Sequence, residues 1–220
     1  MTKVKICGIK SEAALDAALE SGADYVGLVF FGRSPRNIGI AAAQALAARA
    51  RERSRAQVVA LLVDADDALI DRVVAGVRPD FLQLHGEETP ERVAAIHGRT
   101  GVSIMKALGV ASAEDAARAG AYLAPGQKAD LILFDARPPE GGRALPGGNG
   151  LSFDWRMLES VAARHPFALA GGLTAENVAE AIRLTGASIV DVSTGVEVAP
   201  GQKDPELIRR FLRAAKAAKH

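Results

Sequence analysis

The run Val4-Lys5-Ile6-Cys7-Gly8-Ile9 is a short apolar strand that ends at a glycine, and a segment of helical spacing, Ser11–Ser21, follows it. This strand-then-helix unit decides the fold, because the same alternation recurs along the whole chain and we count eight copies. The expected strands are Val4–Cys7, Tyr25–Phe30, Val58–Val63, Phe81–His85, Ser103–Ala107, Leu131–Asp135, Phe167–Ala170 and Ile189–Ser193. The expected helices are Ser11–Ser21, Ala41–Arg53, Asp66–Ala75, Pro90–His97, Ser112–Gly120, Asp154–Arg164, Ala175–Thr185 and Pro205–Ala218.

Eight strands that are each followed by a helix, in a chain of 220 residues, predict a closed α/β barrel of the (β/α)8 (TIM barrel) type. A doubly wound open sheet is the alternative, but such a sheet does not need eight repeats. With 49% hydrophobic residues the chain is long enough for one well-packed core. We therefore expect residues 1–220 to form a single domain.

Charge and composition argue against several classes of partner. Lys and Arg number 27 against 26 Asp and Glu, so a formal charge of +1 offers no general attraction to nucleic acid or an anionic membrane. Apolar runs such as Val58–Val63 are far shorter than the ~20 residues that span a bilayer, and the N-terminus lacks the apolar core of a secretory signal. A single cysteine forms no disulfide within the chain, so we expect a cytoplasmic protein with a small-molecule partner.

One basic run, Arg49, Arg51, Arg53 and Arg55, has the charge of a nucleic-acid patch. No aromatic residues interleave it, and cations near the end of a helix complement the helix dipole. We expect this run to be the solvated end of a helix.

Reactive side chains lie at the C-terminal ends of the expected strands, where barrel enzymes build their active sites. Cys7 ends the first strand, His85 the fourth and Asp135 the sixth, and Arg36 lies in the loop after the second. The long insertion 136–152, rich in Gly and Pro, would lie over the same face as a lid. A lone cysteine is usually an inert core residue, so the case for Cys7 depends on these neighbours.

Two glycine-containing loops predict a phosphate site. Gly171 and Gly172 follow the seventh strand and lead into a helix, and Ser193, Thr194 and Gly195 follow the eighth. Bare backbone amides and a helix N-terminus are suited to binding a phosphate, and in barrels such loops recur after these two strands. We therefore expect a phosphorylated substrate.

The first and last strands of a closed barrel are neighbours, and side chains alternate along each of them. Lys5 shares a face with Cys7, and Asp191 shares a face with Ser193. This arrangement predicts that Lys5 and Asp191 pair inside the barrel.

A set of short motifs covers the chain nearly end to end. The motifs are Lys5-Ile6-Cys7-Gly8-Ile9, Ser34-Pro35-Arg36, Gln83-Leu84-His85-Gly86, Phe153-Asp154-Trp155, Leu169-Ala170-Gly171-Gly172-Leu173 with Asn177-Val178, and Val190-Asp191-Val192-Ser193-Thr194-Gly195-Val196-Glu197 with Lys203-Asp204. In this order and spacing the set resembles the phosphoribosylanthranilate isomerase family, which carries out an Amadori rearrangement in tryptophan biosynthesis. The family usually has Gly-Gly-Thr/Ser-Gly where this chain has Gly147-Gly148-Asn149-Gly150, and two serines where it has Ser193-Thr194.

The resemblance implies a cofactor-free isomerase in which Cys7 is the general base and Asp135 the general acid. Apolar residues beside Asp135 and the negative charges of a bound substrate would favour its protonated form, while Lys5 would favour the Cys7 thiolate. The resemblance also implies that Arg36 contacts the anthranilate carboxylate, which a planar guanidinium suits with two parallel hydrogen bonds.

The sequence leaves several alternatives open. His85 is either a hydrogen-bond partner in the site or a capped strand end, and the spacing of His97, His165 and His220 indicates no metal site. A related aminosugar-phosphate isomerase of histidine biosynthesis is one alternative function, although that family is expected to place Asp where Cys7 stands. A non-catalytic phosphosugar-binding barrel is another. The chain fits a monomer or a homodimer equally well.

Overall fold

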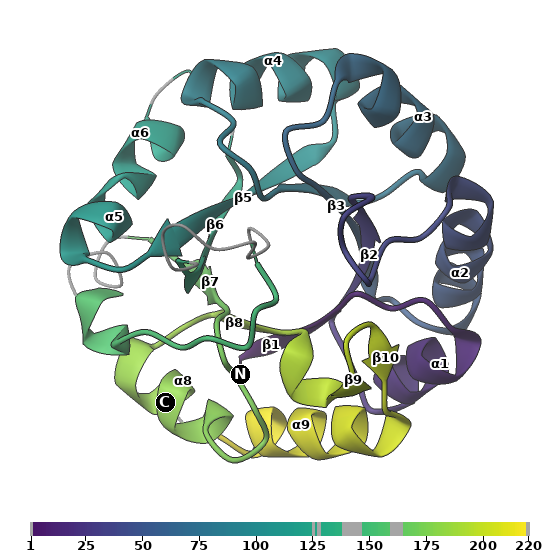
Figure 1. The fold of residues 1–220 in the computed structure, drawn as a ribbon, viewed down its shortest axis with the longest axis vertical. Coiled ribbons are helices and arrows are strands. Elements are labelled where there is room, and N and C mark those ends of the chain that lie inside the picture. Colours follow the sequence, from purple (N-terminus) through teal and green to yellow (C-terminus); the bar gives the residue numbers. More distant parts are fainter. Residues whose placement is uncertain (1, 125, 127–128, 138–146, 159–164, 219–220) are drawn as a thin grey trace.

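Eight parallel strands close into a barrel in the computed structural model, which describes residues 2–124, 126, 129–137, 147–158 and 165–218 (Figure 1). The strands are β1 (Lys3–Cys7), β2 (Tyr25–Phe30), β3 (Gln57–Leu62), β4 (Phe81–Leu84), β5 (Ser103–Val110), β6 (Leu131–Ala136), β7 (Phe167–Leu169) and β8 (Ile189–Val192). They are hydrogen-bonded in sequence order, and β8 closes the barrel on β1. The predicted (β/α)8 class is confirmed.

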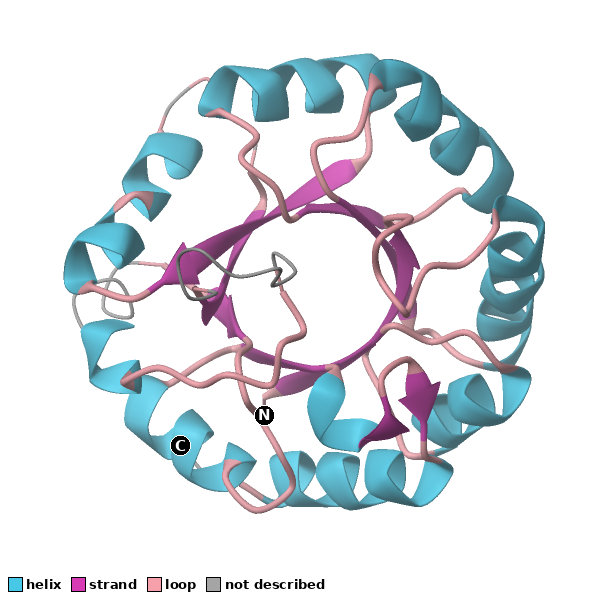
Figure 2. Ribbon diagram, in the orientation of Figure 1, coloured by secondary structure: helices cyan, strands magenta, loops and turns pink. Residues whose placement is uncertain are grey.

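A ring of helices surrounds the strands (Figure 2). The helices within the described residues are α1 (Glu12–Glu20), α2 (Ile40–Arg53), α3 (Asp67–Val77), α4 (Pro90–Thr100), α5 (Ala113–Ala117), α6 (Ala119–Leu123), α8 (Val178–Thr185) and α9 (Pro205–Ala217). Ser11, Thr89 and Asp204 cap their helices, because each side chain accepts a hydrogen bond from the amide three residues later. Among the described residues no helix has the length and apolar character needed to cross a membrane.

Several predicted helices differ from the structure; Pro90–His97, for example, extends to Thr100 as α4. The segment Ser112–Gly120 forms two short helices, α5 and α6, which meet at Arg118. The helix expected from Ala175 begins at Val178 instead. Only the short 3₁₀ helix η1 (Trp155–Leu158) stands where Asp154–Arg164 was expected, and residues 159–164 lie outside the described part.

The late start of α8 has a local cause. The Thr174 amide donates to Asn177 Oδ1 at 2.8 Å, and Thr174 Oγ1 accepts from the Glu176 amide at 3.2 Å. These side chains satisfy backbone groups in a turn and so compete with the helix. The turn separates the glycine pair after β7 from the helix N-terminus, which corrects the expectation that the two are adjacent.

A hairpin that the sequence analysis did not predict follows β8. The chain forms the 3₁₀ helix η2 (Thr194–Val196) and then two short antiparallel strands, β9 (Glu197–Ala199) and β10 (Gln202–Lys203), before α9 begins. In Figure 1 the hairpin lies beside β1 and α1, at the barrel mouth.

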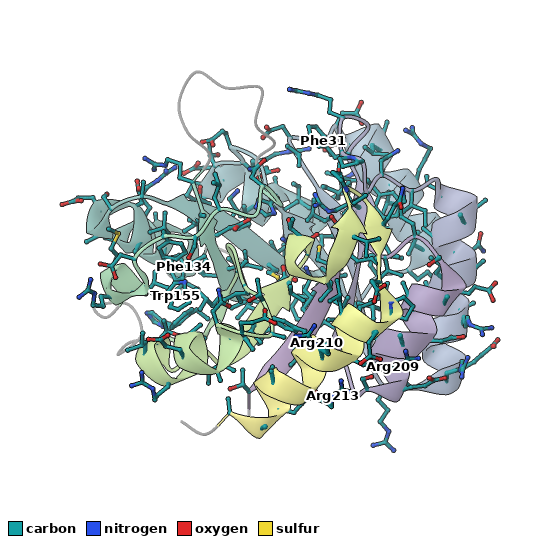
Figure 3. All side chains as sticks on the ribbon, turned by 60° about the horizontal axis from the view of Figure 1, so that its bottom comes forward. Phe31, Phe134, Trp155, Arg209, Arg210 and Arg213 are labelled. Carbon is teal, nitrogen blue, oxygen red and sulfur yellow. The ribbon has the colours of Figure 1, made fainter. Side chains whose placement is uncertain are left out.

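Buried apolar side chains form separate clusters inside the barrel and between the strands and the helices. Val4 and Ile6 of β1 pack outward against the helices, while Lys5 and Cys7 lie inside, as the alternation of a strand requires. Each helix correspondingly has a buried face toward the strands and an exposed face toward solvent. In α9 the exposed Arg210 and Arg213 lie on the outer face, visible in Figure 3.

The arginine residues at the end of α2 contact the neighbouring helices α1 and α3. Arg49 and Arg53 both form ion pairs with Asp16 of α1, at 2.6 and 2.8 Å. Arg51 donates to the backbone carbonyls of Val77 and Arg78 at the end of α3. These contacts agree with the expected helix end.

Candidate active site

A cavity of about 310 Å³ opens at the C-terminal ends of the strands. Most of the predicted site residues line it: Cys7, Arg36, His85, Asp135, Gly171, Gly172, Asp191, Ser193, Thr194 and Gly195. Lys5 lies below them, completely buried, and does not line the cavity. The topology therefore brings the predicted residues of six different strand ends to one place.

The predicted ion pair between β1 and β8 is present. Lys5 Nζ lies 2.8 Å from Asp191 Oδ2, and the two residues are register partners in adjacent strands. Burial works against the charge of Lys5, but the negative charges of Asp191 and of a Cys7 thiolate outweigh it and raise the pKa of Lys5. The other oxygen of Asp191 is buried and has no hydrogen-bond partner among the described residues.

Cys7 lies in an apolar corner of the cavity, against Val29 and Leu61. Burial raises the pKa of the thiol, although the positive charge of Lys5 acts in the opposite direction. The expectation that Lys5 favours the thiolate is right in direction, but desolvation is the larger effect. Burial thus favours the neutral form of the thiol.

The space around the sulfur depends on a glycine. A Cβ atom on Gly27 of β2 would lie only 2.9 Å from Cys7 Sγ. A larger residue at this position would push the thiol out of its place, so Gly27 is a site residue that the sequence analysis missed.

Asp135 contacts a different polar group with each carboxyl oxygen. Its Oδ1 accepts a hydrogen bond from the Ala136 amide at 2.8 Å, and its Oδ2 lies 3.3 Å from His85 Nε2. Gln83 Nε2 lies 3.0 Å from the other ring nitrogen of His85. Because the Gln83 amide nitrogen donates, the proton of a neutral His85 is on Nε2, facing Asp135. His85 thus contacts the predicted acid directly rather than only ending a strand.

The glycine loops after β7 and β8 come close to neighbouring backbone. Gly171 has a φ of +88°, and a Cβ there would lie 2.8 Å from the Ala136 nitrogen and 3.2 Å from Asp135 Oδ1. A Cβ on Gly195 would lie 2.0 Å from the Leu173 carbonyl oxygen. Both positions require glycine on steric grounds, and both leave backbone exposed to the cavity.

Part of the predicted lid loop lies over this site. Gly147 and Gly148 line the cavity, and Thr194 Oγ1 donates to the Gly148 carbonyl at 3.0 Å. A Cβ on Gly147 would come within 2.7 Å of Asp135 Oδ2. Residues 138–146 of the same insertion lie outside the described part of the chain.

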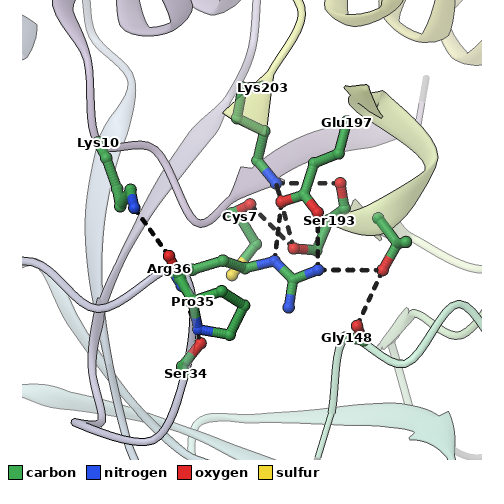
Figure 4. A network of polar contacts seen from close by, with 10 residues as sticks. Cys7, Lys10, Ser34, Pro35, Arg36, Gly148, Ser193, Glu197 and Lys203 are labelled. Carbon is green, nitrogen blue, oxygen red and sulfur yellow. Dashed lines mark hydrogen bonds and ion pairs between the residues drawn. The ribbon is translucent and has the colours of Figure 1, made fainter. Parts of the chain in front are cut away.

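Arg36 is almost fully buried and already has a carboxylate partner within the protein (Figure 4). Its Nε and Nη2 each lie 2.8 Å from an oxygen of Glu197 in β9, and Nη2 also lies 3.3 Å from Thr194 Oγ1. Lys203 of β10 lies 2.5 Å from the same Glu197. The bidentate edge expected to meet the substrate is therefore occupied, which the motif containing Glu197 and Lys203 did not reveal.

Metal ligation has no support in the described residues. No group of three or more His, Cys, Asp and Glu side chains within them is close enough to hold an ion.

The chain matches the family model described as N-(5'-phosphoribosyl)anthranilate (PRA) isomerase over residues 4–214. A relative from Parvibaculum lavamentivorans, named N-(5'-phosphoribosyl)anthranilate isomerase, is 52% identical and covers 98% of this chain and 99% of its own length. A relative of the same name from Cereibacter sphaeroides is 54% identical over 97% of this chain and 98% of its own length.

Solved structures agree with these sequence matches. The crystal structure of phosphoribosyl anthranilate isomerase from Thermotoga maritima is 34% identical, has a TM-score of 0.85, and matches over 98% of this chain and 99% of its own. A phosphoribosyl anthranilate isomerase in complex with reduced 1-(o-carboxyphenylamino)-1-deoxyribulose 5-phosphate is 33% identical with a TM-score of 0.82, over the same shares of the two chains.

Proposed function

This chain belongs to the N-(5'-phosphoribosyl)anthranilate isomerase family, and from that premise we propose how the cavity at its barrel mouth carries out the isomerisation. The reaction is the Amadori rearrangement of phosphoribosylanthranilate to 1-(2-carboxyphenylamino)-1-deoxyribulose 5-phosphate, a step of tryptophan biosynthesis. The observation that carries the mechanism is that Cys7 of β1 and Asp135 of β6 line the same cavity.

Asp135 acts as the general acid. It donates a proton to the ring oxygen of the ribose, the bond between that oxygen and C1′ breaks, and the anilino nitrogen supplies the electron pair that forms the Schiff base. The Ala136 amide, which donates a hydrogen bond to Oδ1, and the His85 ring, whose Nε2 lies 3.3 Å from Oδ2, hold the carboxyl group in place for this transfer.

Cys7 acts as the general base. The thiolate removes the proton from C2′, and the electron pair forms the C1′–C2′ double bond of the enolamine as the Schiff base nitrogen is neutralised. The enolamine then gains a proton at C1′ and loses the proton of the 2′-hydroxyl, which gives the aminoketone. C1′ is reduced and C2′ is oxidised within one molecule, so the step needs no external electron donor or cofactor.

The two ends of the substrate are bound by different parts of the cavity. The backbone around Gly171, Gly172 and Gly195, together with the loop that carries Ser193 and Thr194, receives the phosphate. The two hydroxyls donate to the Cys7 and Gly148 carbonyls, so backbone amides supply the donors. The anthranilate carboxylate meets Arg36 through Nη1, because Nε and Nη2 are engaged by Glu197. A solved relative binds a ligand that carries both a phosphate and a carboxylate, the two groups that this division provides for.

The proposed role of Cys7 also indicates the compartment in which the protein acts. A base that is the only cysteine must remain a reduced thiol, so we place the enzyme in the cytoplasm. The proposed site uses residues of one chain, which is compatible with a monomer or a homodimer.

The decisive experiment follows the loss of anthranilate-type fluorescence when the purified protein meets freshly generated phosphoribosylanthranilate. We expect turnover by the wild type and a fall in kcat of roughly 10²–10⁴-fold in Cys7→Ala and in Asp135→Asn. Asp130→Asn is the matched control, because Asp130 accepts a hydrogen bond from the Ile104 amide at the opposite end of β6. Full activity in either catalytic variant would overturn its role, and no turnover by the wild type would leave a phosphosugar-binding barrel.

A further inference from the structure

The hairpin β9–β10 carries two charged residues that the proposed mechanism does not use. Glu197 and Lys203 are each only 2% exposed at the side chain, and each contacts a residue of the site. Burying a pair of charges costs free energy that a hydrophobic pair would not cost, so their presence calls for an explanation.

We propose that Glu197 is the positioning residue of the substrate-carboxylate site: it holds the Arg36 guanidinium by its Nε/Nη2 edge, and Lys203 keeps the site cationic. This proposal rests on the proposed function, because it assumes that Arg36 binds the anthranilate carboxylate. It adds that the hairpin sets the orientation of the Arg36 guanidinium, and that this orientation is needed for substrate binding.

Hydrogen bonds hold the guanidinium group of Arg36 in one orientation. Two hydrogen bonds of 2.8 Å join its Nε and Nη2 to the two oxygens of Glu197, which is the planar fork that carboxylates and guanidinium groups prefer. Nη1 makes no hydrogen bond to a described residue and lies against Gly148, where a Cβ would be 2.5 Å away. Since Gly148 lines the cavity, the nitrogen that remains available is the one at the substrate side.

The stem of Arg36 is fixed as well. A Cβ on Gly8, whose φ is +84°, would lie 2.7 Å from Arg36 Cδ, so the aliphatic part crosses directly over the backbone beside Cys7. The preceding Pro35 is packed against the hairpin turn, since a Cβ on Gly201 would lie 2.4 Å from the Pro35 carbonyl oxygen. The hairpin therefore holds both the loop that carries Arg36 and the head of its side chain.

Lys203 offsets the negative charge that Glu197 brings to the site. A carboxylate paired with Arg36 alone would cancel its charge and weaken its attraction for an anionic substrate. With Lys203 at 2.5 Å from Glu197 the three groups carry a net charge of +1, and the two cations lower the pKa of Glu197 although its burial acts to raise it. The buried cluster therefore stays attractive to a carboxylate.

The same lysine connects the cluster to the base. Lys203 Nζ donates to the Ser193 carbonyl at 3.0 Å and lies 3.3 Å from Ser193 Oγ, which in turn donates to the Cys7 carbonyl at 3.2 Å (Figure 4). One polar network thus spans the carboxylate site, the phosphate loop and the strand that carries Cys7.

The test is a kinetic comparison of Glu197→Gln with Arg36→Ala. Glutamine keeps the size of the side chain but removes the charge, so we expect KM to rise roughly 10-fold or more, the usual effect of losing a charge-assisted hydrogen bond, while kcat changes much less. In the Arg36→Ala background the Glu197→Gln change should have no further effect on KM, because the two residues act as one unit. Glu176→Gln, which removes an exposed partner of Arg210, is the matched control.

Glu197→Gln leaves Arg36 and Lys203 without a carboxylate and is expected to be unstable, so Glu197→Gln/Lys203→Met, which restores the balance of charge, is measured beside it. The same rise in KM is expected there. An unchanged KM in both variants, while Arg36→Ala raises KM, would overturn the positioning role alone. An unchanged KM in Arg36→Ala would overturn both the carboxylate role of Arg36 in the proposed function and the inference built on it.

Discussion

Lys5 and Asp191 form a 2.8 Å ion pair inside the barrel, although 186 residues separate them in the sequence. Their side chains are 0% and 7% exposed, so each is the main neutraliser of the other's charge. The pair lies directly below Cys7, and the two charges act on the thiol in opposite directions. This ion pair is therefore one of the influences on the charge state of Cys7.

Removing one member of the pair should be costly. In Lys5→Met the buried Asp191 carboxylate loses its only described counter-charge, and we expect urea unfolding to show a loss of about 3–5 kcal/mol. Lys216→Met is the control, because Lys216 and Asp24 form a pair with side chains 27% and 32% exposed, for which a loss of less than about 1 kcal/mol is expected. Lys5→Met/Asp191→Asn should be more stable than Lys5→Met, and equal losses in the two would contradict the argument.

The raised pKa of Cys7 predicts a pH dependence of activity and of stability. Because burial favours the neutral thiol, kcat/KM should increase with pH above neutrality as the thiolate of the free enzyme forms. A group whose pKa is raised on folding stabilises the protein below its unfolded pKa, near 8.5 for cysteine, and this contribution is lost as the pH rises through the folded value.

The thiolate can be followed directly by its ultraviolet absorbance, since Cys7 is the only cysteine, with Cys7→Ala as the blank. A midpoint above that of free cysteine is expected in the unliganded protein. A midpoint at or below it would show that Lys5 outweighs burial.

Changing His85 should affect Asp135, the proposed general acid, rather than substrate binding. His85→Leu removes the polar contact with Asp135 Oδ2, and we expect kcat to fall roughly 10–100-fold with little change in KM. His165→Leu, at an exposed position before β7, should leave both constants unchanged. A rise in KM with unchanged kcat would instead make His85 a direct ligand of the substrate.

The glycine pair after β7 can be tested against a glycine of similar backbone conformation. Gly186→Ala places a Cβ in open space at a φ of +63°, so it should cost about 1–2 kcal/mol of stability and leave KM unchanged. Gly171→Ala adds a collision with the Ala136 nitrogen to the strain of a φ of +88°. It should lose more stability in thermal unfolding and raise KM for the phosphorylated substrate, and equal effects of the two changes would count against a tight phosphate loop.

Local patterns predicted most of the fold because their causes are local. Tyr25–Phe30 is a strand with the expected bounds, since β-branched and aromatic residues between polar turns define it. The late start of α8 was not predicted, because it depends on two side-chain hydrogen bonds of Thr174 and Asn177 that compete with the helix. The hairpin β9–β10 was missed because its strands have only three and two residues, too few for any periodicity.

By itself, the sequence determined the eight-unit barrel and the strand ends that carry Cys7, His85 and Asp135, because periodicity and the closure of a parallel barrel follow from the order of residues alone. Only the tertiary structure decided which groups meet. Arg36 contacts Glu197 across 161 residues, and His85 contacts Asp135. Such contacts depend on side-chain directions and on packing between distant segments, which no local pattern specifies.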